Sequence, residues 1–307
     1  MSTLRLALDW TPNVNHSGFF AAQHFGWFQE AGLQVEIQHP GTDNYLHSPA
    51  KKVELGLADL ALCPLESLLS YRTKSEPLPL LALAAVLQTD LSSIVVKANS
   101  GIERPAQLDG KTYASYKARY EDAQVACLVR NDGGQGHLVL QYPNRLGIWN
   151  TLLNGDADAT WIFDNWEGVQ AQLAGIALRH FRMADYGIPY GYSPVLATTE
   201  AILSTHKEGL EAFLGASARG FAWAASHPQE MAGILLALVP QADQDLAMLT
   251  AAQQATSPHY LHAQGWGYME KERVAAYLNW LLAEGLESTR FDAAALFTNS
   301  LLPNKQS

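Results

Sequence analysis

The first 37 residues constrain the fold of this chain most strongly, because they predict a strand, a loop, a helix and a second strand in that order. Residues 4–8 alternate as a half-buried strand does, apolar residues recur at helical spacing from 19 to 28, and residues 33–37 alternate again. Two strands joined by a helix form a parallel βαβ unit. Ligands bind at the carboxyl ends of such strands. We therefore expect a binding site first in the loop formed by residues 9–16.

This loop is dense in side chains that can bind a ligand. Within eight positions it contains Asp9, Trp10, Asn13, Asn15 and His16. Each residue type also has an ordinary structural role, since a tryptophan can fill a core, an asparagine can cap a helix and a histidine can lie exposed in a first turn. The crowding of all five at a predicted strand end favours a binding loop.

The composition indicates a packed globular protein and excludes several classes of function. The chain has 307 residues, enough for two lobes, with 48% hydrophobic and 16% charged residues. Its net charge of −10 argues against binding to nucleic acid or to an anionic membrane surface. No apolar run approaches the roughly 18 residues of a membrane span, so we expect no membrane insertion.

The sequence predicts neither a cofactor nor a metal. Its two cysteines, Cys63 and Cys127, are too few for a disulfide framework, and its ten histidines show no zinc-type spacing. The glycine-rich loops that hold nucleotide phosphates are missing. The chain starts at Met1 and enters a strand with no basic or apolar leader, which predicts a cytoplasmic protein as encoded. If a leader has been trimmed from the natural protein, a periplasmic or extracellular location is expected instead.

A short internal repeat predicts two similar lobes. Gly-Leu-Ala-Asp at 56–59 recurs as Gly-Asp-Ala-Asp at 155–158, and each copy precedes an apolar strand end and an acidic helix start. The expected fold class is therefore α/β, with two lobes and a ligand cleft between them. Lobe 1 is expected to comprise residues 1–95 and 193–307, and lobe 2 residues 96–192. We also expect helices over 145–153, 199–204, 207–226, 228–238, 242–255 and 270–284.

The acidic helix starts after the repeats supply further candidate residues. Glu66 follows the first copy, and Asp164 and Glu167 follow the second, beside Trp161 and Trp166. Core packing is the alternative for both tryptophans; we assign Trp161 to the core and Trp166 to the cleft. An aromatic ring beside carboxylates suits a flat, nitrogen-bearing ligand, because the ring stacks and the carboxylates accept hydrogen bonds from its N–H edges.

A third strand-to-helix junction, residues 113–122, carries Tyr116, Lys117 and Arg119. Backbone N–H groups at a helix start, together with these two cations, can hold an anion. A solvated helix start explains the same residues equally well.

Several motifs together resemble the SsuA/Thi-like family of periplasmic-type substrate-binding proteins, and most closely its ThiY-type binders of thiamine pyrimidine precursors. The motifs are Leu-Asp-Trp-Thr-Pro-Asn at 8–13, Gly-Trp-Phe at 26–28, the Gly-x-Ala-Asp of 56–59, Glu-Ser at 66–67, Trp-Glu at 166–167, Gly-Trp-Gly-Tyr-Met at 265–269 and Phe-Thr-Asn at 297–299. The resemblance covers almost the whole chain. It implies a periplasmic-binding-protein-like type II fold that closes on a small ligand.

The resemblance implies a function and a set of ligand-binding residues. The function is non-catalytic binding of a formylaminopyrimidine or hydroxymethylpyrimidine for uptake or salvage, with an ABC transporter permease as a partner. The resemblance places Trp10, Asn13, Glu66, Asp164 and Glu167 in the site, with Tyr190 as a further candidate. The sequence patterns described above add His16, Tyr116 and Trp166 to the expected ligand-binding residues. The alternatives are a synthase-like or desulfinase-like enzyme and a binder of another flat heterocycle such as a flavin.

The chain departs from the related fungal hydroxymethylpyrimidine phosphate synthase at the positions that carry its chemistry. The lysine that holds pyridoxal phosphate and the histidine consumed in that reaction align with Cys63 and Ser67. The cysteine-rich iron motif is missing from residues 187–194, and the bulky residues 116–120 replace a glycine-rich phosphate loop. These departures argue against the synthase reaction and against a phosphorylated ligand.

Overall fold

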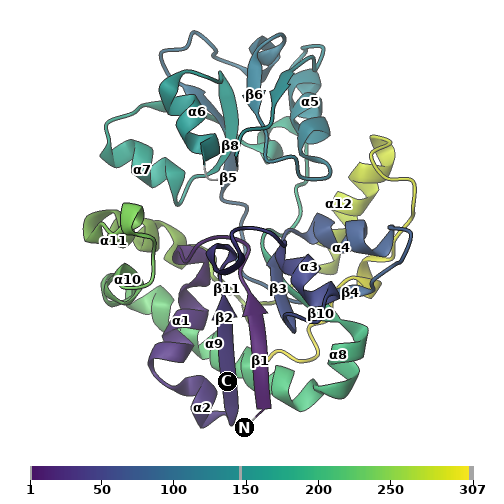
Figure 1. Cartoon of the computed structure of the whole chain (residues 1–307). Helices are drawn as coiled ribbons and strands as arrows, with labels where there is room; N and C mark the ends of the chain where they lie inside the picture. Colours follow the sequence, from purple (N-terminus) through teal and green to yellow (C-terminus); the bar gives the residue numbers. More distant parts are fainter. Residues whose placement is uncertain (1, 145–146, 304–307) are drawn as a thin grey trace. The chain divides into compact units, whose positions relative to one another are not determined.

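A computed structural model of the chain describes residues 2–144 and 147–303. The chain forms two compact units, each built around its own five-stranded sheet (Figure 1). Unit 1 comprises Met1–Asp90, Gly191–Ala275 and Phe291–Ser307, and unit 2 comprises Leu91–Tyr190 and Ala276–Arg290. None of the helices in the described part of the chain combines the length and apolar character needed to cross a membrane.

Unit 1 contains the predicted βαβ start and most of the predicted C-terminal helices. Its strands are β1 (Ser2–Ala7), β2 (Leu33–Gln38), β3 (Leu60–Cys63), β4 (Leu80–Ala85), β10 (Val195–Thr199) and the short pair β11 (Leu261–His262) and β12 (Gly265–Trp266). Its helices are α1 (Ser17–His24), α2 (Trp27–Glu30), α3 (Pro49–Glu54), α4 (Leu65–Arg72), α8 (Glu200–Thr205), α9 (Lys207–Ser226), α10 (Pro228–Leu236), α11 (Leu246–Thr256) and the first residues of α12 (Lys271–Ala283).

The main sheet of unit 1 has the order β2-β1-β3-β10-β4. β1 runs parallel to β2 and β3, with Leu4 opposite Val35, while β10 is antiparallel to β3 and β4. The alternation of residues 4–8 thus predicted a real strand, and the carboxyl ends of β1 and β3 meet at one edge of the sheet.

The helix expected over 19–28 is interrupted. α1 ends at His24 and α2 begins at Trp27, because Gly26 adopts a left-handed conformation with φ of 75° between them. Only glycine adopts this conformation without strain. The apolar spacing continues across the break, which is why the periodicity alone suggested a single helix.

Two glycines allow α1 and α9 to approach closely. A methyl group added at Gly220 would overlap the carbonyl oxygen of Gly18, and one added at Gly18 would overlap the ring of Phe221. Phe221 in turn stacks on Trp266 with 4.5 Å between ring centroids. This contact fixes α1, and with it the loop that precedes α1, against the longest helix of the unit.

Unit 2 repeats the sheet arrangement of unit 1. Its strands are β5 (Ser92–Lys97), β6 (Thr112–Ala114), β7 (Val139–Gln141), β8 (Ala159–Phe163) and β9 (Leu178–Phe181), and its helices are α5 (Glu121–Asn131), α6 (Ile148–Asn154) and α7 (Glu167–Leu173). The sheet order is β7-β6-β8-β5-β9, with β6 parallel to β7 and β8 and with β5 antiparallel to β8 and β9. For the helix expected over 145–153, residues 145 and 146 lie outside the described residues.

The repeated aspartates make the same contact in both units. Asp59 accepts a hydrogen bond from the backbone N–H of Arg5 at 2.8 Å, and Asp158 accepts one from the backbone N–H of Thr112 at 2.9 Å. Each aspartate also donates its own N–H back to the same residue, at 2.9 Å in both cases. The repeat therefore ties β3 to β1 and β8 to β6, which makes it a structural motif.

The C-terminal helix differs from the expected domain division. We expected all of residues 193–307 in lobe 1, whereas residues 276–290 belong to unit 2. Tyr277 accepts a hydrogen bond from Gln124 at 2.7 Å, Trp280 packs against the apolar core of unit 2, and Glu287 accepts a hydrogen bond from Arg119 at 2.7 Å. These partners are distant in sequence, so the periodicity of the helix could not reveal them.

Candidate functional site

Two carboxylates and a thiol gather at the carboxyl ends of β1 and β3. Asp9 follows β1, Cys63 ends β3, and Glu66 lies in the first turn of α4. Burial raises the pKa of Cys63 to about 12, with further increases from the charges of Asp9 and Glu66. Both carboxylates therefore lie close to the thiol. Glu66 is 5% exposed and Asp9 is half-buried, which gives this strand edge a concentrated negative charge.

The raised pKa of Cys63 argues against the alternative that this residue is a nucleophile. A thiolate is the reactive form of cysteine, and reactive cysteines have pKa values below the ordinary value of about 8.5. Cys63 has the opposite environment, because it is buried beside two negative charges. Its side chain also forms a hydrogen bond with Ser67, which opposes the rise in pKa without reversing it.

His16 organises the loop after β1 from a buried position. It is 0% exposed, and its Nδ1 accepts the backbone N–H of Asn13 at 3.2 Å. Because a backbone N–H can only donate, Nδ1 carries no proton and Nε2 carries one. Nε2 therefore donates to Asp9 Oδ1, at 2.8 Å. Both ring nitrogens are engaged, so in this structure His16 contributes to the predicted site by holding Asp9 and Asn13.

Asn13 also bonds mainly to its own loop. Its Oδ1 accepts the backbone N–H of Asn15 at 2.9 Å, and its Nδ2 donates to the carbonyl oxygen of Thr11 at 3.1 Å. The residue caps the short 3-10 helix η1 (Val14–His16) and is 7% exposed. Its capping role, one of the alternatives given by the sequence, is present.

Trp10 differs from these buried neighbours because it is only half-buried. Its ring meets the ring of Tyr45 edge-on, with 6.1 Å between centroids and 66° between planes. Trp10 thus presents a partly exposed aromatic ring at the residue that follows Asp9 in the chain, as the stacking hypothesis requires. Asp9 itself was not among the predicted ligand-binding residues, although it lies beside Trp10; its hydrogen bond to His16 could not be read from the sequence.

In unit 2, Tyr116 and Glu167 lie at the carboxyl ends of neighbouring parallel strands. Tyr116 follows β6, and Glu167 begins α7 after β8. The pKa of Tyr116 lies well above its usual value, first because of burial and next because of the charge of Glu167. Glu167 also accepts the backbone N–H of Phe163 at 3.0 Å. The two predicted site residues are therefore close to each other.

The aromatic residues of unit 2 divide between core and periphery. Trp161 is 8% exposed and belongs to the apolar core, as predicted. Tyr190 is half-buried and packs between Trp161 and Tyr277, with ring centroids at 5.3 Å and 5.7 Å. Trp166, which we expected to face a ligand, is 7% exposed at the residue before α7.

Asp164 has a different set of partners from the ligand contacts that we expected. Its Oδ1 accepts hydrogen bonds from Ser93 at 2.5 Å and from His180 at 2.8 Å, and its Oδ2 accepts one from Arg182 at 3.1 Å. These partners come from β5, from β9 and from the residue after β9. Asp164 also lines a cavity that contains neither Tyr116 nor Glu167.

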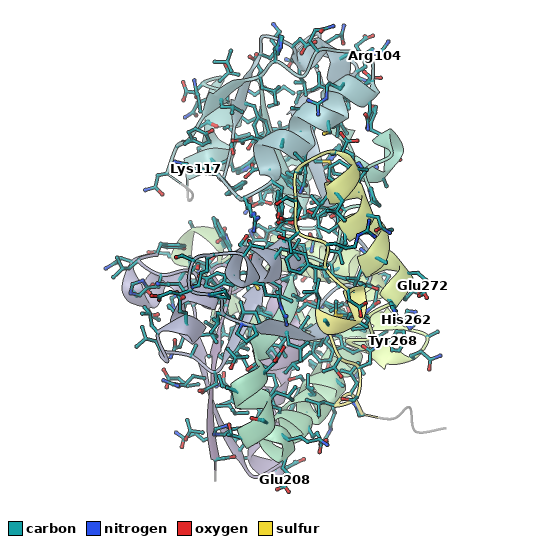
Figure 2. All side chains as sticks on the ribbon, turned by 90° about the vertical axis from the view of Figure 1, so that its right-hand side faces the viewer. Arg104, Lys117, Glu208, His262, Tyr268 and Glu272 are labelled. Carbon is teal, nitrogen blue, oxygen red and sulfur yellow. The ribbon has the colours of Figure 1, made fainter. Side chains whose placement is uncertain are left out.

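The anion site considered for residues 113–122 is filled by the chain itself. The backbone N–H groups of Tyr116 and Ala118 donate to the carboxylate of Glu121, at 3.0 Å and 3.1 Å. Arg119 donates to Glu287 at 2.7 Å, and Lys117 projects outward (Figure 2). Two backbone N–H groups and the guanidinium of Arg119 thus already bind carboxylates, which supports the solvated helix start.

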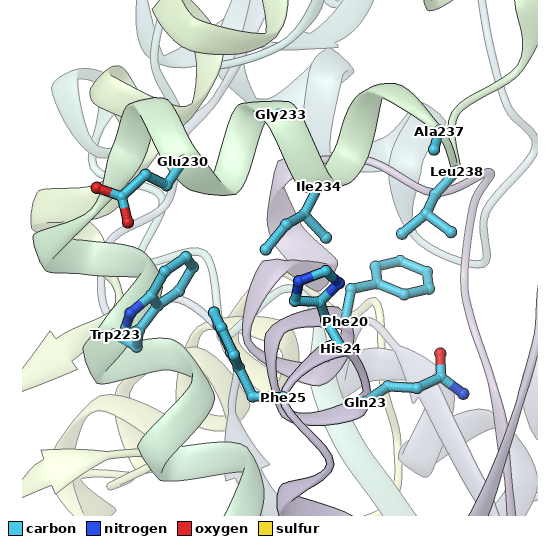
Figure 3. A pocket seen from close by; sticks show the side chains of 10 residues that line it. All are labelled: Phe20, Gln23, His24, Phe25, Trp223, Glu230, Gly233, Ile234, Ala237 and Leu238. Carbon is cyan, nitrogen blue, oxygen red and sulfur yellow. The ribbon is translucent and has the colours of Figure 1, made fainter.

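A separate apolar cavity of about 580 Å³ lies in unit 1 between α1, α9 and α10. Figure 3 shows its walls, which include the rings of Phe20, Phe25 and Trp223. None of the predicted ligand-binding residues lines it. This cavity is therefore separate from the predicted site residues.

Comparison with known proteins identifies the family. A family model described as NMT1/THI5 like matches residues 13–231, well over half of the chain. The chain belongs to the NMT1/THI5 like family. The resemblance found in the sequence is thereby confirmed.

The individual relatives share less than 30% sequence identity with this chain. The chain is 27% identical over 237 residues to the formylaminopyrimidine-binding protein of Halalkalibacterium halodurans, covering 77% of this chain and 70% of the relative. It is 23% identical over 319 residues to the riboflavin-binding protein RibY of Chloroflexus aurantiacus, covering 99% of this chain and 87% of the relative.

A solved structure confirms the fold class. The alkanesulfonate-binding protein SsuA of Xanthomonas axonopodis pv. citri, solved bound to MOPS, superposes with a TM-score of 0.70 at 15% identity, covering 96% of this chain and 98% of that chain. The predicted periplasmic-binding-protein-like α/β fold is therefore correct. At this level of identity the likeness concerns the fold and not the ligand.

Proposed function

We propose that this protein binds an aminopyrimidine of the formylaminopyrimidine or hydroxymethylpyrimidine type and releases it unchanged. The observation that carries the proposal is the pairing of an aromatic ring with carboxylates at the carboxyl ends of parallel strands in both units. In unit 1 these groups are Trp10, Asp9 and Glu66, and in unit 2 they are Tyr116 and Glu167.

The chemistry of these groups matches the proposed ligand. An aminopyrimidine is flat, so its faces stack on an aromatic ring, and its amino group donates hydrogen bonds that carboxylates accept. Bonds to a charged acceptor stabilise a complex more than bonds between neutral groups. The formylaminopyrimidine-binding relative supports this choice of ligand.

Other features support binding without catalysis. Cys63 lies in an environment that disfavours its thiolate, and both ring nitrogens of His16 are engaged in hydrogen bonds. The loop after β6 uses its N–H donors on Glu121, which supports a ligand without a phosphate group. We propose further that the protein delivers its ligand to an ABC transporter permease.

Replacement of Glu167 by glutamine tests the proposal. If Glu167 accepts a hydrogen bond from the ligand, the variant should bind about 1–3 kcal/mol more weakly. The matched control is Glu208→Gln, because Glu208 also lies in the first turn of a helix but is exposed on α9. Isothermal titration calorimetry with a formylaminopyrimidine measures both. Equal affinity of the Glu167 variant and the wild-type protein would remove Glu167 from the site.

A flavin is the second candidate ligand. The riboflavin-binding relative aligns with 99% of this chain, and a flavin is also a flat nitrogen heterocycle that can stack on a ring. Titration of riboflavin with the protein, followed by quenching of the flavin fluorescence, distinguishes the two candidates. A flavin-binding protein should quench the fluorescence, whereas an aminopyrimidine-binding protein should leave it unchanged at comparable concentrations.

A further inference from the structure

Another cavity, of about 460 Å³ and with a polar lining, lies within unit 2 between α7 and β9. Its wall on α7 is made of small or flexible residues, including Gly168 and Gln172, and ends at Gly175. A methyl group added at Gly175 would meet no atom within 4 Å. Facing this open wall are the side chains of His180 and Arg182.

Asp164 is the only carboxylate that lines this cavity, and its oxygens are already used. It accepts hydrogen bonds from the buried Ser93, from His180 and from Arg182. Burial alone would raise its pKa, but the bonds from His180 and Ser93 and the charge of Arg182 outweigh burial and lower it. Asp164 is therefore ionised at neutral pH and acts mainly to orient its partners.

Two basic side chains of the cavity, His180 and Arg182, retain polar atoms that can bind another group. His180 contacts Asp164 through Nδ1, and among the described residues its Nε2 has no partner. Arg182 uses one terminal nitrogen on Asp164, and its side chain is 55% exposed, so the rest of the guanidinium can bind another group. Asp164, His180 and Arg182 are the only titratable groups among the lining residues, since α7 contributes none.

We propose that this cavity binds a small oxyanion through His180 and Arg182. The guanidinium fork of an arginine matches two oxygens of such an anion, and a protonated imidazole donates a third hydrogen bond through Nε2. Asp164 acts as a positioning residue for both donors. The site is separate from the proposed pyrimidine site and does not depend on it.

The test uses sulfate, and acetate as the carboxylate counterpart. Each is titrated into the full-length protein at constant ionic strength while the imidazole NMR signals are recorded. We expect saturable shifts of the His180 signals, and roughly tenfold weaker binding or more in Arg182→Ala. Stronger binding of sulfate would assign the site to sulfate-like or phosphate-like anions, and stronger binding of acetate to carboxylates.

The control variant is Arg219→Ala, because Arg219 is 56% exposed and also pairs with a single carboxylate, Glu30, at 2.8 Å. It should bind sulfate as the wild-type protein does. Circular dichroism verifies that each variant is folded. Shifts that do not saturate, or that are the same in Arg182→Ala, would overturn the proposal. The purely structural role of the Ser93–Asp164–His180 cluster would then remain.

Discussion

Cys63 should react with alkylating reagents far more slowly than an ordinary cysteine. With a pKa of about 12, only about one Cys63 side chain in ten thousand is ionised at pH 8, against about one in four for a thiol of pKa ~8.5. The thiolate population is therefore smaller by a factor of roughly 2,000. A more basic thiolate is intrinsically more nucleophilic, which restores a factor of about 25–60 for a Brønsted coefficient of ~0.4–0.5. The net expectation is alkylation about 40–100 times slower, before the reagent's limited access to a side chain that is 3% exposed is considered.

The assay measures iodoacetamide modification by mass spectrometry in a Cys127→Ser background, so that Cys63 is the only thiol. A short peptide with one cysteine gives the reference rate. Unfolding the protein in guanidinium should restore that rate, because the pKa shift belongs to the folded structure. Modification of folded Cys63 at or above the peptide rate would refute the reasoning and would revive the hypothesis of a catalytic thiol.

Two further predictions concern the stability of the units. Gly220→Ala should lower the free energy of unfolding by about 1–3 kcal/mol, because the added methyl group overpacks against Gly18. Gly215→Ala on the same helix, where an added methyl group meets nothing, should raise the free energy of unfolding by about 0.5–1 kcal/mol. Urea unfolding measures both variants, and a smaller loss of stability in Gly220→Ala than in Gly215→Ala would contradict the packing. Burial alone would raise the pKa of Asp59, but the hydrogen bonds from Arg5 outweigh burial and lower it. This carboxylate therefore stabilises the fold above the unfolded-state pKa of about 3.9, and the stabilisation is lost as the pH falls through the folded-state pKa. Asp59→Asn should thus be less stable than the wild-type protein at pH 7 by about 1–3 kcal/mol, and this difference should shrink toward pH 3 in thermal unfolding; a difference independent of pH would contradict the assignment.

The sequence was sufficient to predict the strands that are determined by the pattern of their own residues. Residues 4–8 and 33–37 form parallel neighbouring strands because their alternation buries one face of each. The repeat at 56–59 and 155–158 correctly indicated two similar sheets, and the structure adds the reason, namely that each final aspartate bonds to the backbone of the adjacent strand.

The sequence was insufficient wherever the partner lies far along the chain. Residues 276–290 were expected in lobe 1 because a helical pattern does not say which core it will pack on. The bonds of Asp164 to Ser93 and His180 depend on the order of three strands, which the sequence does not give. In the proposed site, Tyr116 and Glu167 lie close together because β6 and β8 are parallel neighbours. The buried position of His16 could not be predicted from the residues next to it in the sequence.

Native mass spectrometry tests the central claim most directly. The purified protein is mixed with equal concentrations of a formylaminopyrimidine, a hydroxymethylpyrimidine, riboflavin and an alkanesulfonate, and the mass of the retained ligand is measured before and after its release. We predict that one aminopyrimidine is retained and is released with its mass unchanged. Retention of riboflavin instead would identify a flavin, the second candidate, as the ligand. Retention of the alkanesulfonate alone, or release of a ligand with an altered mass, would contradict the account.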